Sequence, residues 1–338
     1  MRRAELERLR AERIALDLRA TNRRRRTDAR QVLRLQAQHL TCVRAAAAIC
    51  GAQIRGDALG SQSLEFRPAH PPQAGEYVLD VTEARGSGSA GATALVLQTV
   101  LVPLAMASGE SRLTIRGGTH VPFSPPFSYI QHVYLPALWR MGIKAQVELK
   151  RYGWYPAGGG EIAVKIQAAQ QLLPVMLVER GELRKVWGTA AVSNLPSHIA
   201  QRMASRAVNV LKDAGIKGHI EAAHVEATGP GAGIFLFAEY EHGVAGFTAY
   251  GRKGLPSERV AESACHDLTA HHRRDAAVDL HLADQLVLPA AFAAGASRWT
   301  TCRVSRHLTT NAWVVRQFLN VPINITGDEG GPGAVSVG

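Results

Sequence analysis

The chain repeats one local pattern: an apolar helical stretch, a glycine, and then a short run typical of a β-strand. The glycine stands where a helix needs a left-handed residue before the chain turns into a strand. The five copies are Val43 to Ile54 around Gly51, Leu95 to Ile115 around Gly109, Leu135 to Val147 around Gly142, Ala207 to Ile220 around Gly215, and Leu286 to Val304 around Gly295. Irregular spacing of these glycines argues against a solenoid. The pattern predicts an α+β fold, with helices layered on several small mixed sheets.

Eight segments have the alternation or the β-rich composition of strands. They are Ser63 to Arg67, Tyr77 to Thr82, Arg112 to Arg116, Ala145 to Lys150, Glu161 to Ile166, Lys185 to Val192, Gly233 to Glu239 and Gly246 to Tyr250. The polar run Gln167 to Pro174 separates two sets of these strands. We therefore expect a large domain of residues 35–178 and 274–338, and a smaller inserted α/β domain of residues 179–273.

The net charge of +11 is concentrated at the N-terminus. Residues 1–34 contain 12 Arg and five acidic residues, whereas the other 304 residues carry a net charge of only +4. Arginine-rich segments bind phosphate, so the charge favours a nucleic-acid partner without requiring one.

The composition also indicates the compartment. Four cysteines without CxxC spacing predict neither a zinc site nor a disulfide framework, which fits a reducing cytoplasm. The N-terminus has no apolar core of a secretory signal. The longest uncharged stretch, 86–109, contains Gln98 and Pro103, so we interpret it as a loop and a buried helix and expect no membrane association.

Two loops contain residues that suit ligand binding. In Arg116 to Tyr129, His120 is either a ligand or a solvated loop histidine. In Arg151 to Gly160, aromatic residues beside three glycines suit base stacking or ordinary turn packing. A third segment, Arg85 to Gly91, matches the phosphate-binding pattern GxGxxG. A dinucleotide-binding fold requires an acidic residue at the end of the next strand, whereas Glu110 precedes that strand.

The segment Val304 to Leu319 offers a histidine nucleophile. His307 follows an expected strand, and Thr309, Thr310 or Asn311 is expected to cap a helix that begins near Ala312. The positive end of the helix dipole favours a neutral imidazole and an anionic phosphate, as attack on a phosphate requires. Spacing alone favours a solvent-exposed loop histidine.

Together these segments resemble the RNA 3'-terminal phosphate cyclase family, from about Leu35 to near the C-terminus. The resemblance rests on QHLT (38–41), GSAG (88–91) with LVLQTVL (95–101), RGGTHVPFSPP (116–126), YPAGGG (155–160), HLADQLVLP (281–289) and HLTTN (307–311). It implies a large domain of repeated helix-and-sheet units, similar to the C-terminal domain of translation initiation factor 3, with a smaller inserted domain.

The resemblance also implies a reaction. A histidine takes AMP from ATP with the help of a divalent cation, Mg or Mn. The AMP passes to an RNA 3'-phosphate, and the neighbouring 2'-hydroxyl displaces it to leave a 2',3'-cyclic phosphate. RNA with a 3'-phosphate end is thus the implied partner.

Roles for individual residues follow from the matched motifs. His307 is the implied nucleophile, and Gln38 and His39 the implied contacts of the RNA phosphate. The metal ligands are not assigned, although Asp284 is the carboxylate of the matched segments. The implied ATP-binding residues are Gln98, His281, Leu282, Ala283, Asp284 and Gln285.

Residues 1–34 depart from the family. The family begins with a strand and a GEGGGQ-type loop that supplies a catalytic glutamate, and this segment shows neither. A shifted reading frame or a misplaced start explains the departure and predicts weak activity. A basic RNA-binding arm is the alternative.

Two other functions compete with the cyclase. A non-catalytic cyclase-like RNA-binding protein of ribosome assembly is expected to lack the nucleophile, so His307 favours the enzyme. A nucleotide-dependent oxidoreductase built on 85–91 leaves the other motifs unexplained. The sequence carries no signature of an oligomeric state.

Overall fold

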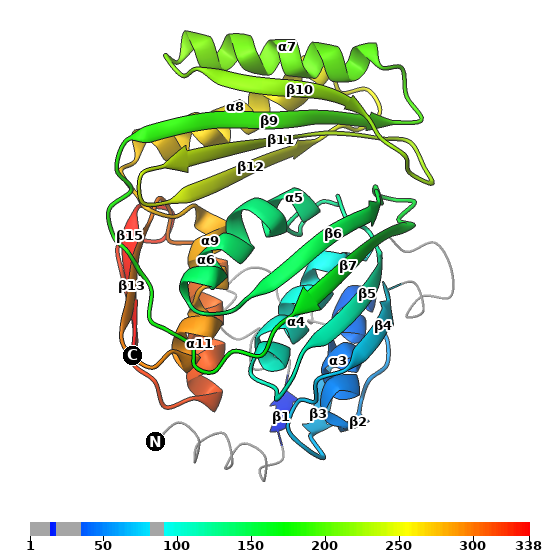
Figure 1. The fold of residues 1–338 in the computed structure, drawn as a ribbon, viewed down its shortest axis with the longest axis vertical. Helices are drawn as coiled ribbons and strands as arrows, with labels where there is room; N and C mark the ends of the chain where they lie inside the picture. The colour runs from blue at the N-terminus through cyan, green and yellow to red at the C-terminus, as the bar shows by residue number, and fades with distance from the viewer. Residues whose placement is uncertain (1–13, 18–34, 82–90) are drawn as a thin grey trace.

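The computed structural model describes residues 14–17, 35–81 and 91–338, which form helices packed on four small sheets (Figure 1). The first sheet is antiparallel, in the order β1-β3-β2, and the second is mixed, in the order β4-β5-β7-β6. Their strands are β1 (Ile14–Asp17), β2 (Gln53–Arg55), β3 (Ser63–Arg67), β4 (Glu76–Asp80), β5 (Ser111–Gly117), β6 (Ala145–Arg151) and β7 (Gly160–Ile166).

The other two sheets are also mixed, in the orders β10-β9-β11-β12 and β14-β15-β13-β8. The third sheet lies at one end of the molecule, with helices on its outer face (Figure 1). The strands are β8 (Met176–Leu177), β9 (Leu183–Ser193), β10 (Gly218–His224), β11 (Gly231–Tyr240), β12 (Val244–Tyr250), β13 (Ser297–Thr301), β14 (Ile323–Thr326) and β15 (Gly333–Val337). The architecture is α+β, as the sequence predicts.

The helices divide between two hydrophobic cores. The helices are α3 (Ala37–Cys50), α4 (Thr93–Ala105), α5 (Phe127–Tyr129), the π-helix η2 (Ile130–Tyr134), α6 (Leu135–Arg140), α7 (His198–Asp213), α8 (Ser257–Arg273), α9 (Leu280–Gln285), α10 (Val287–Phe292) and α11 (Arg306–Phe318). Residues of α7, α8 and the third sheet form one core, and the other helices share the larger core. The larger core contains the fully buried Trp299, whose indole N–H donates to the carbonyl of Ala283, 3.2 Å away. This bond holds the short helix α9 against β13.

The sequence patterns predicted the strands better than the glycine turns. Each of the eight expected strand segments coincides with a strand whose ends lie within two residues of those expected. Gly51, Gly142 and Gly215 adopt left-handed φ angles of 59°, 84° and 76° just after helices, as predicted. Gly109 has a φ of 139° but lies beyond the end of α4. The prediction was wrong for Gly295, because α10 ends at Phe292 and the extended Ala293 turns the chain instead.

Residues 1–34 contribute a strand, contrary to the expectation from sequence. β1 pairs antiparallel with β3 in a register that places Ile14 opposite Phe66. The sequence Ile-Ala-Leu-Asp has three apolar residues in a row, but this run is too short to predict a strand, and many arginines surround it. The remaining residues of 1–34 lie outside the described residues. So do residues 85–90 of the GxGxxG match.

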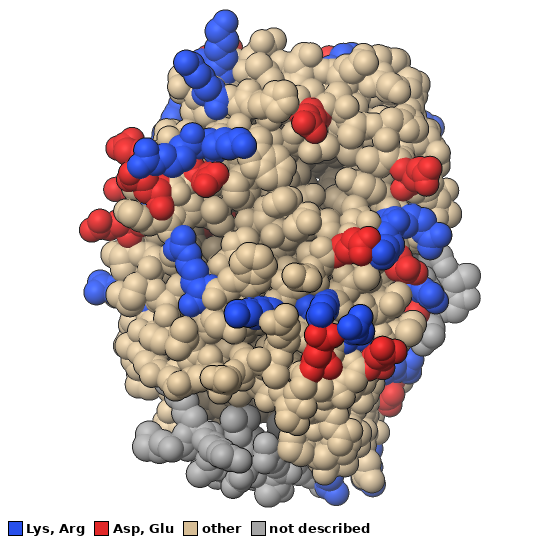
Figure 2. Space-filling model, viewed as in Figure 1, with Lys and Arg blue, Asp and Glu red and all other residues tan. Residues whose placement is uncertain are grey.

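Charges of both signs are interspersed on the face shown in Figure 2. On the sheet formed by β4 to β7, Arg116 pairs with Glu161 at 2.9 Å, and Glu110 pairs with both Arg112 and Lys165 at 2.9 Å. This neutral mixture agrees with the small net charge beyond residue 34. In the described ranges no helix has the length and apolar character needed to cross a membrane.

Candidate active site

His307 lies in the first turn of α11, because this helix begins six residues earlier than the sequence suggested. The helix begins at Arg306, and the hydroxyl of Ser305 caps it by accepting the backbone N–H of Leu308 at 3.1 Å. The prediction of a helix beginning near Ala312 was therefore wrong, because Ser305 supplies the cap expected of Thr309, Thr310 or Asn311. The first turn contains no acidic side chain, so the positive end of the helix dipole is available to an anion.

Asp284 holds the imidazole of His307. Its Oδ2 atom lies 2.6 Å from Nδ1 of His307. An ionised carboxylate only accepts hydrogen bonds, so the proton of this pair lies on Nδ1 and the lone pair of the neutral ring lies on Nε2. The His307 side chain is 84% exposed, whereas that of Asp284 is 12% exposed. A buried carboxylate thus orients an accessible imidazole, as in other sites where histidine acts as a nucleophile or base.

Within the described residues, two buried oxygen atoms at this site have no hydrogen-bond partner. They are Oδ1 of Asp284 and Oε1 of Gln285, the last two residues of α9. Leaving a buried polar atom unpaired costs about 1–3 kcal/mol, so we expect water or a ligand to supply the missing partner. Tyr134 is also buried near Asp284, and burial together with the Asp284 charge raises the pKa of its hydroxyl.

The HLADQ segment places its residues in two environments. His281 is exposed at the start of α9, and its ring lies edge-on to Tyr129 with 6.3 Å between centroids. Leu282 and Ala283 are buried in the larger core, so their side chains face away from any ligand. Asp284 and Gln285 complete the helix next to α11. The polar residues of the segment therefore suit ligand contact, and the apolar ones anchor it.

The remaining predicted site residues lie on two neighbouring helices. Gln98 is half-buried on α4, and Gln38 and His39 occupy the first turn of α3, where Gln38 is half-buried and His39 is exposed. α3 packs against α4. The first turn of α3, like that of α11, contains no acidic side chain.

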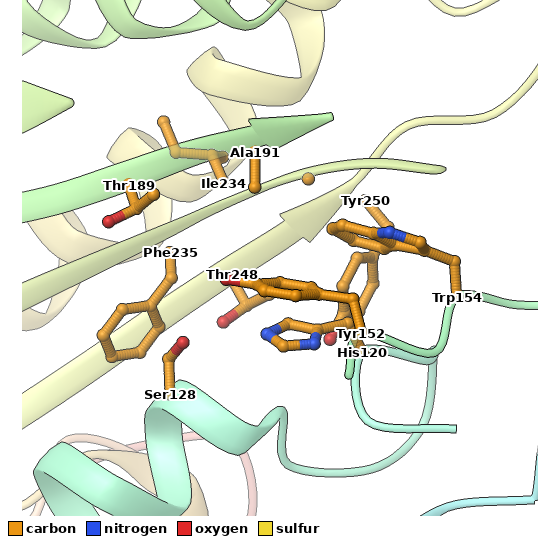
Figure 3. A pocket seen from close by; sticks show the side chains of 11 residues that line it. His120, Ser128, Tyr152, Trp154, Thr189, Ala191, Ile234, Phe235, Thr248 and Tyr250 are labelled. Carbon is orange, nitrogen blue, oxygen red and sulfur yellow. The ribbon is translucent and has the colours of Figure 1, made fainter. Parts of the chain in front are cut away.

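His120 and the aromatic loop line a small cavity instead of facing solvent (Figure 3). His120 is 6% exposed and stacks on Tyr152 with 4.5 Å between ring centroids. Burial lowers the pKa of His120 to about 3, so the ring is neutral near pH 7. Trp154, 3% exposed, and Tyr250 of β12 also line the cavity. Trp154 thus packs the loop against the third sheet, whereas Tyr155 is 66% exposed.

Sequence reasoning missed the residues that hold α9 in place. The Asp279 carboxylate caps α9 by accepting the backbone N–H groups of His281 and Leu282 at 2.8 and 2.9 Å. The hydroxyl of Tyr129 donates to the same carboxylate at 2.8 Å. An aspartate just before a short helical run is a recognisable capping signal. The pairing with Tyr129 spans 150 positions and has no local signal.

Comparison with known proteins places the chain in a family. The sequence pattern of the family described as RNA 3'-terminal phosphate cyclase matches residues 23–325. The match therefore begins upstream of Leu35, where the motif resemblance starts. The chain belongs to the RNA 3'-terminal phosphate cyclase family.

Three curated relatives, each named RNA 3'-terminal phosphate cyclase, illustrate the similarity. The protein of Nostoc punctiforme is 56% identical over 84% of this chain and 82% of the relative. The protein of Methylococcus capsulatus is 53% identical over 90% of this chain and 84% of the relative. The protein of Salmonella agona is 40% identical over 86% of this chain and 81% of the relative.

Proposed function

We propose that this protein converts an RNA 3'-phosphate to a 2',3'-cyclic phosphate in an ATP-dependent reaction, with His307 as the nucleophile that accepts AMP. The observation that supports this most is the pairing of an exposed His307 ring with the buried Asp284 carboxylate through Nδ1. Because the pairing occupies Nδ1, we assign the attack to Nε2. Membership of the cyclase family supplies the reaction, and the geometry supports the residue.

The reaction proceeds in three balanced steps. Nε2 of His307 forms a bond to the α-phosphorus of ATP, the bond to the bridging oxygen breaks, and pyrophosphate leaves. A 3'-phosphate oxygen of the RNA then attacks the same phosphorus and releases His307. Finally the 2'-hydroxyl attacks the 3'-phosphorus, losing its proton, and AMP leaves. Asp284 stabilises the positive charge that develops on the imidazole in the first step.

ATP is expected to bind across the end of α9 and the start of α11. Among the described residues Oε1 of Gln285 has no partner, so it can accept a hydrogen bond from a hydroxyl or amino group, which ribose and adenine both supply, and Asp284 lies beside it. His281 offers an exposed ring for stacking, and Gln98 is the further proposed contact. Leu282 and Ala283 contribute only through their backbone, because their side chains are buried.

A divalent cation, Mg or Mn, fits this site with one protein ligand. No group of three or more His, Cys, Asp or Glu side chains gathers in the described ranges. Oδ1 of Asp284 is nevertheless a buried carboxylate oxygen without a partner, and Mg²⁺ commonly takes one or two carboxylates with the substrate phosphates and water. When bound, the cation neutralises charge on the triphosphate.

The RNA 3'-phosphate is proposed to bind at Gln38 and His39. They lie at the N-terminus of α3, where backbone N–H groups and the helix dipole favour an anion.

We also infer that residues 179–273 form the inserted domain and that the protein is cytoplasmic. The separate core of α7, α8 and the third sheet supports the former. Four free cysteines support the latter.

Labelling with α-³²P-ATP tests the proposal. Incubation with a divalent cation should give an acid-labile, base-stable protein–AMP adduct, and His307→Ala should abolish it. The matched control is His281→Ala, which should weaken ATP binding and still permit labelling at high ATP. Equal labelling of His307→Ala would exclude His307 as the nucleophile, and no labelling of the wild type would favour a non-catalytic RNA-binding protein. We predict weak activity because of residues 1–34. Labelling is therefore followed for hours, so that slow formation of the adduct is detected.

A further inference from the structure

The helix that carries Asp284 is too short to hold its own position. α9 has six residues, and isolated helices of that length are unstable because nucleation costs more than a few hydrogen bonds return. The distance between Asp284 and His307 therefore depends on the side chains that fix the two ends of α9.

Asn311 fixes the C-terminal end of α9. Its Nδ2 atom donates to the backbone carbonyl of Asp284 at 3.0 Å. Asn311 lies four positions after His307, so both side chains project from one face of α11. α11 thus contacts Asp284 twice, at the carboxylate through His307 and at the carbonyl through Asn311. Contact at two separate atoms fixes the direction of the carboxylate as well as its distance.

Tyr129 and Asp279 fix the N-terminal end. The Asp279 carboxylate is 2% exposed, caps α9, and accepts a hydrogen bond from the Tyr129 hydroxyl. Burial and the Asp279 charge raise the pKa of Tyr129 well above its usual value, so its hydroxyl stays a donor. Tyr129 adjoins the π-helix η2, and such helices are frequent at functional sites.

We propose that Asn311 is a positioning residue for the transfer of AMP to His307, and that Tyr129 acts from the opposite end of α9 through Asp279. Asn311 holds the backbone of Asp284 on α11, so that its carboxylate meets Nδ1 of His307 and fixes the orientation of the ring. This inference rests on the proposed function for its catalytic consequence. Its structural part, the orientation of the His307 ring, stands independently.

The test combines adenylation kinetics with a double-mutant cycle. Asn311→Ala should lower the single-turnover rate about 10–100-fold, the usual effect of removing a group that orients a ligand residue, with KM for ATP changed less than about 2-fold. Thr310→Ala, at a neighbouring exposed position of α11, is the control and should leave the rate unchanged. In an Asp284→Asn background, Asn311→Ala should have no further effect, because Asn311 acts through Asp284.

Imidazole ¹⁵N chemical shifts give a readout that a loss of stability does not move. In folded wild type the His307 proton should lie on Nδ1, and in Asn311→Ala the ring should populate both tautomers. Tyr129→Phe removes only the hydroxyl and should shift the tautomers in the same direction by less. Tyr129→Phe also provides the tautomer test if Asn311→Ala does not fold.

Several results would overturn the proposal. These are a wild-type rate for Asn311→Ala, an equal loss of rate in the Asp284→Asn background, or an unchanged His307 tautomer in both variants. Failure of the proposed function looks different, because the wild type would then form no adduct while the tautomers still shifted as described.

Discussion

Two helix pairs use charged side chains in opposite ways. α7 and α8 are joined at the surface by Arg202 with Glu258 and by Arg206 with Glu262, and every carboxylate oxygen of these pairs has a partner. α9 and α11 are joined by His307 and Asp284, where one carboxylate oxygen is paired and the other is buried with no partner among the described residues. The first arrangement completes its own bonding, whereas the second retains capacity for a ligand.

The difference separates stability from chemistry. The α7–α8 pair rests on an apolar core that includes the fully buried Met203, and its ion pairs lie in solvent, where screening weakens them. The α9–α11 pair has a buried charge that stability alone does not explain, because burying a carboxylate costs free energy unless all its bonds are made. We therefore expect substitutions at the two places to change different measurements.

The largest expected effect is on adenylation by Asp284→Asn. The substitution keeps the shape of the side chain and removes the charge that stabilises the imidazolium, so the rate should fall roughly 10²–10⁴-fold. The free energy of unfolding should change by less than about 1 kcal/mol, since a buried charge is removed. Quench-flow labelling and urea denaturation measure the two quantities. An unchanged rate with a large loss of stability would make the pair structural and break the comparison.

Met203→Ala should show the reverse behaviour. Truncation of a fully buried Met in the smaller core should lower the free energy of unfolding by about 2–5 kcal/mol. The rate of adenylation, measured where the variant is folded, should match the wild type. A rate loss comparable to that of Asp284→Asn would show that the two regions are coupled.

The smallest effect is expected for the surface pair of Arg202 and Glu258. A double-mutant cycle should give a coupling close to zero that decreases further in high salt. Hydrogen bonding to Arg202 lowers the pKa of Glu258, so this stabilisation is present above the carboxylate's usual pKa and is lost as the pH falls through the lowered value. A coupling that survives both 1 M salt and pH 2 would contradict the assignment of this pair to the solvent-exposed surface.

The sequence predicted local features well because they depend on neighbouring residues. Alternation of apolar residues predicted strands such as β5 and β7, where one face is buried at every second position. The pattern of capping residues gave the wrong start for α11, since Ser305 and Thr309 are both acceptable caps and only tertiary packing selects between them. The prediction of a turn at Gly295 was also wrong, because the extended Ala293 already ends the helix.

The site was only partly predictable. His307 and Asp284 were each implied by matched motifs, but their direct contact depends on how α9 packs against α11 across 23 positions. Asn311 was one of three candidate caps and is instead a donor to Asp284. Tyr129, the last residue of α5, meets Asp279 because both α5 and α9 pack into the larger core. Such long-range contacts leave no periodicity in the sequence.

The atom that carries AMP tests the central claim most directly. The adduct formed from ATP by protein with ¹⁵N-labelled histidine can be examined by ¹⁵N and ³¹P NMR, which distinguish a bond at Nε2 from one at Nδ1. Since Asp284 occupies Nδ1 of His307, the account predicts a nitrogen–phosphorus bond at Nε2 of His307 and a proton retained on Nδ1. AMP attached at Nδ1 of His307, or at any other residue, would contradict it.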